Sequence, residues 1–188
     1  MVFGLLGSIL ARWVALFRGV NVGGHNKVPM AKLCSLLESI ECRNARHYIQ
    51  SGNVVFESTV KSKAKLRTAI TEAVENEFGF RPALMLLAAS EFKAALDNNP
   101  FSSAASEPKS LHFYFLEWKP EQPDMDGIAK LAVATERFEL KGEVFYLLAR
   151  AGFGTSKLAA AAERKLGVAA TARNFATVKK LAEMLTNG

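Results

Sequence analysis

The sequence predicts an α+β protein of two subdomains, the first of them ferredoxin-like, and three observations support this class. The chain has 188 residues, of which 49% are apolar and 22% charged, as in globular proteins of one domain or two small halves. Segments of the first half follow the order β-α-β-β-α-β, the split arrangement of the ferredoxin-like fold. The second half follows β-α-β-β-α-α, a variation on the first that we expect to pack against it.

The first half begins with a strand and a helix. Residues 12–17 are a short apolar run of strand length. A Gly-rich loop follows, and Pro29 then marks the start of a helix, because its fixed φ angle suits the first helical turn. The apolar residues that share one face of this helix are Met30, Leu33, Cys34, Leu37 and Ile40.

A hairpin, a helix and a strand complete the first half. Residues 46–50 and 53–57 have the character of two strands, and the two-residue turn Ser51-Gly52 between them predicts a hairpin. Apolar residues repeat at helical spacing over residues 62–78, so we expect a helix there. Residues 83–88 form a further apolar strand.

The second half follows a helix over residues 90–96, which ends at Asn98-Asn99-Pro100. Residues 101–110 are rich in Ser and Pro and form the expected junction between the halves. The elements expected after the junction are a strand over 111–116, a helix over 127–134, a hairpin of 138–140 and 143–148, and helices over 156–166 and 174–185.

The expected boundaries follow from these elements. Residues 1–11 are an N-terminal extension, because they are apolar but lack the basic leading segment of a secretory signal. The ferredoxin-like subdomain covers residues 12–97 and the second α+β subdomain residues 98–188. No apolar run reaches the roughly 18 residues that a membrane span needs. The two cysteines are expected to be buried, reduced thiols of a cytoplasmic protein.

The net charge of +6 is distributed unevenly along the chain. Residues 1–67 carry a net charge of +7, residues 68–150 carry −5 and residues 151–188 carry +4. Two basic ends that meet in space would form a positive surface, which favours anionic ligands. The alternative is a solvated surface with dispersed cations.

The loop at residues 18–27 (RGVNVGGHNK) invites comparison with phosphate-binding loops. Two of its glycines have the P-loop spacing, but His25 and Asn26 replace the lysine that reaches the phosphates and the hydroxyl that binds magnesium. The dinucleotide-binding pattern fails as well, because Asn21 occupies the position of its middle glycine. The loop therefore predicts neither a nucleotide triphosphatase nor a dinucleotide site.

The same loop suits a simpler anion site. A Gly-rich backbone that enters a helix, here through Gly23 and Gly24, exposes N–H groups to an anion. Arg18, His25 and Lys27 would add charge. The structural alternative is that the glycines adopt positive φ angles and that the asparagines hydrogen-bond the backbone.

The turn at residues 50–53 (QSGN) is a second polar segment. Glycine and a short polar residue are what a two-residue turn needs, and Gln50 and Asn53 would project amide groups beside it. The same hairpin tests for an RNA-recognition motif, which carries aromatic residues at two exposed positions of its third strand. Residues 53–56 (NVVF) lack them, so the stacking platform of that module is missing.

Two expected helix starts in the second half are also polar. Ser156 is a good N-cap, and the capped end would hold an anion beside Lys157, although capping alone explains the serine. Asn174 is a natural N-cap of the last helix. Arg173 has no capping role. It would either grip a carboxylate or phosphate through two hydrogen bonds or pair with the acidic middle segment.

The sequence assigns no catalytic residue and no cofactor. The three histidines are scattered, and no Ser-His-Asp or Cys-His arrangement can be argued from the chain. The polar segments 18–27, 50–53 and 171–174 contain no Asp or Glu. This composition argues against a metal centre and against paired-carboxylate chemistry.

Four blocks of sequence resemble the bacterial domain of unknown function 1697 family. Residues 13–30 (WVALFRGVNVGGHNKVPM) look like the opening of that family, and residues 48–56 (YIQSGNVVF) are similar to its second block. Residues 155–158 (TSKL) and 171–181 (TARNFATVKKL) resemble its closing blocks. The resemblance covers residues 12–186 and implies a cytosolic α+β protein of two subdomains, one of them ferredoxin-like. It implies no activity.

The resemblance also marks polar positions, and such positions on loops mark a site more often than a packing need. These positions are Arg18, Gly19, Asn21, Gly23, Gly24, Lys27, Gln50, Ser51, Gly52, Asn53, Ser156, Lys157, Arg173 and Asn174. All of them except Gly19 and Gly52 are the ligand-binding residues that we predict.

The sequence supports three hypotheses. The first is a protein that binds a small anionic or phosphate-containing ligand, such as a nucleotide, a phosphorylated metabolite or a nucleic-acid backbone, where the loop, the turn and the Arg173 segment meet. The second is a metal-independent enzyme in which the same groups stabilise developing negative charge and His25 carries a proton. The third is a protein-interaction module without a small ligand.

Overall fold

Two compact units make up the structure, a computed structural model that describes residues 10–186. The units are Met1–Ser90 and Glu91–Gly188. Most of the expected N-terminal extension, residues 1–9, lies outside the described residues. The division at residue 90 precedes the boundary expected after residue 97, because most of the helix between these positions packs within the second unit.

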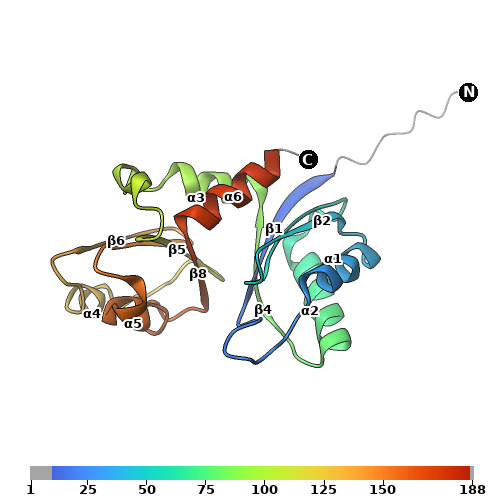
Figure 1. The fold of residues 1–188 in the computed structure, drawn as a ribbon, viewed down its shortest axis with the longest axis horizontal. Helices are drawn as coiled ribbons and strands as arrows, with labels where there is room; N and C mark the ends of the chain where they lie inside the picture. Colours follow the sequence, from blue (N-terminus) through green and yellow to red (C-terminus); the bar gives the residue numbers. More distant parts are fainter. Residues whose placement is uncertain (1–9, 187–188) are drawn as a thin grey trace, which may run out of the picture. The chain divides into compact units, whose positions relative to one another are not determined.

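The first unit has the ferredoxin-like order expected from the sequence (Figure 1). Its elements are β1 (Ala11–Arg18), α1 (Met30–Ser39), β2 (Arg43–Tyr48), β3 (Asn53–Ser58), α2 (Lys63–Phe78) and β4 (Ala83–Ala88). The strands form one antiparallel sheet in the order β2-β3-β1-β4, so β2 and β4 are its edges. The α+β class with a ferredoxin-like first part is confirmed.

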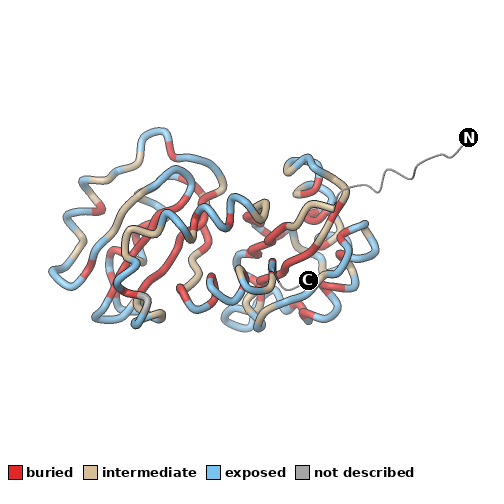
Figure 2. Tube along the Cα trace, turned by 90° about the horizontal axis from the view of Figure 1, so that it is seen from above, coloured by how far each residue is buried: buried red, intermediate tan, exposed pale blue. Residues whose placement is uncertain are grey.

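Alternation along the strands builds the core of the first unit. Trp13, Ala15 and Phe17 of β1 point to the face that α1 and α2 cover, where they pack with Leu37 and Ile70 of these helices. Figure 2 shows that buried positions are concentrated along the strands. The helices bury the apolar stripes that their sequence spacing predicts.

The second unit repeats this strand order. Its elements are α3 (Ala89–Asp97), the 3₁₀ turn η1 (Ser102–Ser106), β5 (Leu111–Leu116), α4 (Met125–Ala129), β6 (Glu136–Lys141), β7 (Val144–Ala149), η2 (Phe153–Thr155), α5 (Lys157–Leu166), β8 (Ala170–Asn174) and α6 (Phe175–Thr186). The antiparallel sheet has the order β6-β7-β5-β8, which matches the order of the first sheet position by position.

The second sheet carries helices on both faces. Helices α4 and α5 cover one face, and α5 contributes Leu158 to the core there. On the other face, Phe92 of α3 stacks on Phe115 with ring centroids 5.4 Å apart. Phe175 of α6 stacks on Phe113 of the same strand with centroids 6.0 Å apart. Helices α3 and α6 therefore form a second helical layer on this sheet, in addition to the β-α-β-β-α-β elements that the two units share.

Residues 170–174 differ from the expectation. The sequence predicts that residues 171–174 open the last helix, but they belong to β8, which pairs antiparallel with β5. The second unit is therefore β-α-β-β-α-β with helices at both ends. The strand was missed because the segment ATARN alternates only two small alanines with polar residues, which is a weak strand signal. Its conformation depends on pairing with β5, which is distant in sequence.

Both cysteines are buried and form no disulfide, as expected. Burial and then the neighbouring carboxylate of Glu41 raise the pKa of Cys42 to about 12. No helix within residues 10–186 combines the length and the apolar character that crossing a bilayer requires.

Candidate anion-binding site

The basic loop, residues 18–27, forms a miniature hairpin. The backbone N–H of His25 donates to the carbonyl of Val22 at 3.1 Å. Gly23 and Gly24 form the two-residue turn between them, with φ angles of 59° and 80°. A type I′ turn requires positive φ at both central positions, which glycine adopts without strain. The sequence predicted that these glycines lead into α1. In the structure they form the tip of a hairpin instead.

Asn21 fastens the basic loop to its surroundings. Its side-chain N–H groups donate to the carbonyls of Val28 at 2.9 Å and Gln50 at 2.8 Å, and its Oδ1 accepts from the N–H of Val28 at 2.8 Å. Asn26 donates to the carbonyl of Gly19 at 3.1 Å. These side chains hydrogen-bond the backbone, as the structural alternative for this loop predicts. Their amide groups maintain the shape of the loop.

Gly52 allows the turn at residues 50–53 to approach the loop closely. Its carbonyl accepts a hydrogen bond of 2.8 Å from the N–H of Phe17. A Cβ atom at position 52 would lie 2.5 Å from Cγ2 of Val20 and 2.8 Å from Cβ of Phe17. Because interiors are close-packed, a side chain here would force the turn away from the loop.

The other turn residues divide into buried and exposed groups. Asn53 is fully buried and donates to the carbonyl of Tyr48 at 3.2 Å and to Oγ of Ser51 at 2.9 Å. Gln50 is exposed, and its carbonyl accepts the bond from Asn21. Asn53 thus serves the hairpin itself, whereas Gln50 presents its side chain to solvent.

Positive charge gathers in the unit that contains the basic loop. Arg18, His25 and Lys27 are exposed on it. The first unit has 11 Lys and Arg against 6 Asp and Glu, a net charge of +5, and the second has 13 against 12, a net charge of +1. The field of the first unit therefore attracts anions more strongly than that of the second.

Ser156 caps α5, as predicted. Its Oγ accepts from the N–H of Ala159 at 2.9 Å and donates to Oε1 of Glu136 at 2.5 Å. Ser156 and Glu136 are both buried, and Lys157 at the start of the helix is exposed. The serine hydroxyl therefore serves the cap and a buried carboxylate, and the lysine is the group at this helix end that faces solvent.

Asn174 caps α6 while it ends β8. Its Oδ1 accepts from the N–H of Thr177 at 2.9 Å, as predicted for an N-cap. The neighbouring Arg173 donates from Nη1 to Oγ1 of Thr171 at 2.7 Å and to the carbonyl of Ala172 at 2.9 Å. Burial lowers the pKa of Arg173 to about 10, so the guanidinium stays protonated at neutral pH but is largely withdrawn from water.

The structure joins two of the three predicted polar segments. Residues 18–27 and 50–53 lie in the first unit and share the bond between Asn21 and Gln50. Ser156, Lys157 and residues 171–174 lie in the second unit. A single site that combines all three segments stays a prediction.

The middle of the sheet face that α1 and α2 leave uncovered in the first unit is aliphatic. Val14 and Leu16 of β1 and Val55 of β3 point to this face, and all three are buried. In RNA-recognition modules, aromatic residues on the two central strands stack on bases there. The central strands β1 and β3 present none on this face, in agreement with the sequence.

Two features of β2 were not predicted. The strand begins at Arg43, three positions before the expected start, and exposes Arg43, Arg46 and His47. Its polar sequence RNARHY lacks the apolar alternation that marks a strand. Sγ of Cys34 lies 3.7 Å from Nδ1 of His47, a contact that sequence spacing did not suggest.

Within the described chain, no three His, Cys, Asp or Glu side chains gather as a metal site would require.

Comparisons with known proteins agree with the fold and name no ligand. A family model described as "Protein of unknown function (DUF1697)" matches residues 10–146. Among solved structures, the conserved bacterial protein SP0830 from Streptococcus pneumoniae is 27% identical, with a TM-score of 0.68. The similarity covers 94% of this chain and 99% of that one, so it extends over both units. A search of the curated proteins gave no match.

Proposed function

The chain belongs to the DUF1697 family of proteins of unknown function, and from its own geometry we propose that it binds a phosphate-containing anion at the basic loop and the adjoining turn. The ligand is a nucleotide, a phosphorylated metabolite or the backbone of a nucleic acid. The proposal takes its support from the exposure of Arg18 and Lys27 on the basic loop and of Gln50 on the turn that Asn21 fastens to it.

Preorganisation of the loop is the observation on which the proposal depends. The side chain of Asn21 and the close approach of Gly52 hold the loop and the turn together. Arg18, His25 and Lys27 are exposed on this frame. A frame that is ordered before the ligand arrives loses less conformational entropy on binding. Exposed cations on such an ordered frame therefore suit anion binding better than cations on a flexible segment.

Each exposed group has a role that suits its chemistry. The planar guanidinium of Arg18 donates two parallel hydrogen bonds to a phosphate, and Lys27 supplies a compact charge. Gln50 adds a neutral donor that orients the ligand. Gly23 and Gly24 present backbone without side chains, so the ligand approaches closely. In this proposal Asn21, Ser51 and Asn53 shape the site and make no direct contact.

The second unit contributes separate candidates. Lys157 is exposed at the first turn of α5, where the helix dipole also favours an anion. Arg173 is the other cation that we predict in this unit. Ser156 and Asn174, which lie beside Lys157 and Arg173 in the chain, cap helices α5 and α6. We propose Lys157 and Arg173 as secondary contacts to the same class of ligand.

A protein-interaction module is the second candidate function, and exposed apolar residues favour it. Val22 beside the hairpin tip is 63% exposed, and Ile49, the first residue after β2, is 49% exposed. A protein partner that covered these side chains would remove their apolar surface from water, which favours association. In this alternative the cations of the loop steer an acidic partner and bind no small ligand.

A thermal-shift screen with inorganic phosphate, nucleotides, sugar phosphates and coenzymes tests the proposal. A ligand at a hundred times its Kd stabilises the protein by about 2.7 kcal/mol, a rise in Tm of roughly 5–11 °C at this chain length. We expect Arg18→Ala and Lys27→Ala to abolish the rise. The control is Arg81→Ala, which removes an exposed arginine that pairs with Glu75 at 2.7 Å.

The outcomes separate the two candidate functions. A rise in Tm that the two loop variants lose and the control keeps supports the anion site. A rise that all variants keep places the ligand elsewhere and contradicts the proposal. A flat screen, together with loss of binding to a protein partner in Val22→Ser, supports the interaction module instead.

A further inference from the structure

Strand β2 is a basic outer edge of the first sheet. Its six residues, RNARHY, include two arginines and one histidine and no acidic residue. Arg43, Arg46 and His47 are all exposed. One residue after the strand ends at Tyr48, the turn at residues 50–53 begins, and the Asn21 bond joins this turn to the basic loop. The turn therefore connects the basic edge to the basic loop within the first unit.

A bulge directs the two arginines of this edge to the same side. Arg43 pairs with Glu57 and Arg46 pairs with Val55, with a register shift between them. In a regular strand, residues three positions apart point to opposite faces. Glu57 and Val55 are two positions apart and share a face, and directly paired residues point to the same face. The bulge, in which Asn44 has a φ angle of 53°, therefore aligns the arginines.

Tyr48 continues the row that the arginines begin. It pairs with Asn53, two positions before Val55 on β3, so it faces the same side as Arg43 and Arg46. Successive residues on one face of a strand are about 6.8 Å apart, so the row from Arg43 to Tyr48 spans roughly 14 Å. The order along this edge is thus two guanidinium groups and then an aromatic ring, at a regular spacing, with the basic loop beyond.

We propose that this row binds a single-stranded nucleic acid along its sugar–phosphate backbone. Arg43 and Arg46 contact successive phosphates, Tyr48 stacks on a base, and the basic loop receives the next phosphates. The inference rests on the proposed function, because the loop is part of the path, and it adds the class of ligand. The phosphate of a mononucleotide contacts one member of a row this long, whereas a strand of repeating phosphates contacts all of them.

The carboxylate opposite Arg43 does not cancel the charge of the row. Glu57 accepts hydrogen bonds from Nδ2 of Asn44 at 2.8 Å and from Nε of Arg12 at 3.1 Å. The bond from Asn44, and then the bond and charge of Arg12 with the charge of Arg46, lower the pKa of Glu57. Arg12 already compensates this carboxylate, which leaves the row with a net positive charge.

Protection of the sheet edge is the competing explanation for these cations. Charged residues on edge strands prevent pairing between sheets of different molecules. That purpose needs charge alone, and a bulge by itself already disrupts such pairing. It does not require two arginines and a tyrosine aligned on one face. The alignment is therefore the feature that favours a repeating anion.

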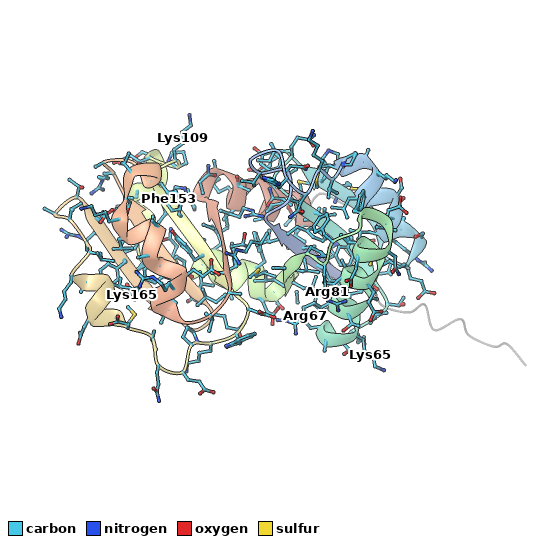
Figure 3. The ribbon with its side chains drawn as sticks, turned by 90° about the horizontal axis from the view of Figure 1, so that it is seen from below. Lys65, Arg67, Arg81, Lys109, Phe153 and Lys165 are labelled. Carbon is cyan, nitrogen blue, oxygen red and sulfur yellow. The ribbon has the colours of Figure 1, made fainter. Side chains whose placement is uncertain are left out.

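Fluorescence anisotropy with labelled oligothymidylates of about 5, 10 and 20 nucleotides tests the inference, since single-strand sites span about 4–16 nucleotides. The variants are Arg43→Ala with Arg46→Ala, and Tyr48→Leu. The matched control is Arg81→Ala. Arg81 lies two positions before β4, the opposite edge of the same sheet, and Figure 3 labels its side chain. Thermal unfolding of each variant verifies its fold.

We expect affinity to increase from the shortest to the longer strands. The double arginine variant should bind about 10- to 100-fold more weakly. Its slope of log affinity against log salt should be smaller by about 1.4, since each lost phosphate contact removes about 0.7. Tyr48→Leu should weaken binding by roughly 5- to 100-fold with little change in the slope, because stacking is not ionic. Arg81→Ala should bind like the unaltered protein.

Three results would overturn the inference. A mononucleotide that binds as tightly as the longest strand overturns it and leaves the proposed function intact. Oligonucleotide binding that survives the double arginine variant but disappears in Arg18→Ala with Lys27→Ala shows that the loop alone is the site. Absence of oligonucleotide binding at low salt overturns it as well. Binding that needs the edge but not the loop supports the inference and contradicts the role proposed for the loop.

Discussion

The side-chain amide of Asn21 donates a 2.8 Å hydrogen bond to the backbone carbonyl of Gln50, a residue 29 positions further along the chain. The bond joins the basic loop to the turn that connects β2 and β3. Two polar segments that look independent in the sequence therefore behave as one structural element. A change in the turn is therefore expected to alter the position of the cations in the loop.

Replacement of Asn21 tests this coupling. Asn21→Ala removes three hydrogen bonds of about 0.5–1.5 kcal/mol each and places alanine at a φ of 55°, so we expect a loss of about 2–4 kcal/mol of unfolding free energy. Asn21→Gly removes the same bonds without the backbone strain and should lose about 1 kcal/mol less. Urea unfolding measures both. A loss below about 0.5 kcal/mol in Asn21→Ala would show that the bonds do not hold the loop.

Gly52→Ala should destabilise the protein more than an alanine at another glycine of similar conformation. The new Cβ would lie 2.5 Å from Val20 and 2.8 Å from Phe17, at a φ of 73°. We expect a loss of about 2–4 kcal/mol from strain and overpacking. The matched control is Gly142→Ala, with a φ of 58° and open space around it, for which we expect about 1–2 kcal/mol. Equal losses in thermal or urea unfolding would contradict the close approach.

Ser156→Ala should cost more than the loss of an ordinary helix cap. The cap itself contributes about 1 kcal/mol, and the hydroxyl also donates to the buried carboxylate of Glu136, a bond of about 1.5–3 kcal/mol. We expect a total loss of about 2–4 kcal/mol in denaturant unfolding. Ser62→Ala, at the exposed cap of α2, serves as the comparison and should lose about 0.5–1 kcal/mol. Similar losses in the two variants would show that the Glu136 contact is dispensable.

The stability of the second unit should fall as the solution is acidified, because of His112. This residue is buried and stacks on Phe153 with ring centroids 3.6 Å apart. Burial lowers its pKa from 6.5 to about 4, so the folded protein disfavours the protonated form. The loss of unfolding free energy begins as the pH falls below 6.5, where the unfolded state takes up a proton, and is complete near pH 4. It amounts to about 3 kcal/mol.

The variant His112→Phe isolates this effect, because phenylalanine keeps an aromatic ring against Phe153 and cannot be protonated. Unfolding free energies of both proteins are measured between about pH 7.5 and about pH 4.5. We expect the difference between them to shift in favour of the variant by about 2–3 kcal/mol as the pH falls. A difference that is independent of pH would show that His112 is accessible to protons in the folded state.

Local pattern explains how much of the fold was predictable. The helices Met30–Ser39 and Lys63–Phe78 bury the apolar stripes that their spacing marks, and the order of the first half is the observed one. Strand β2 was partly missed because RNARHY carries no apolar alternation, and β8 was missed because ATARN alternates only two small alanines with polar residues. Their extended conformation comes from hydrogen bonds to β3 and β5, which are partners that the local sequence does not contain.

The candidate site shows the same division. Glycine, asparagine and cationic residues distinguish the basic loop and the turn from the rest of the chain by residue type alone. Residue type does not reveal which of these side chains face inward. Asn21 and Asn53 direct their amides to the protein backbone, whereas Arg18, Lys27 and Gln50 are exposed. That distinction depends on the positions of carbonyl groups from other segments.

The sequence by itself determined the α+β class, the ferredoxin-like order of the first unit, the buried faces of its helices and the polar segments, because these follow from residue type and short-range periodicity. Only the tertiary structure decided that the loop and the turn form one frame, that Asn174 ends a strand and also caps a helix, and that a bulge aligns Arg43 with Arg46. Each of these depends on strand register and backbone pairing between distant segments, which short-range pattern does not encode.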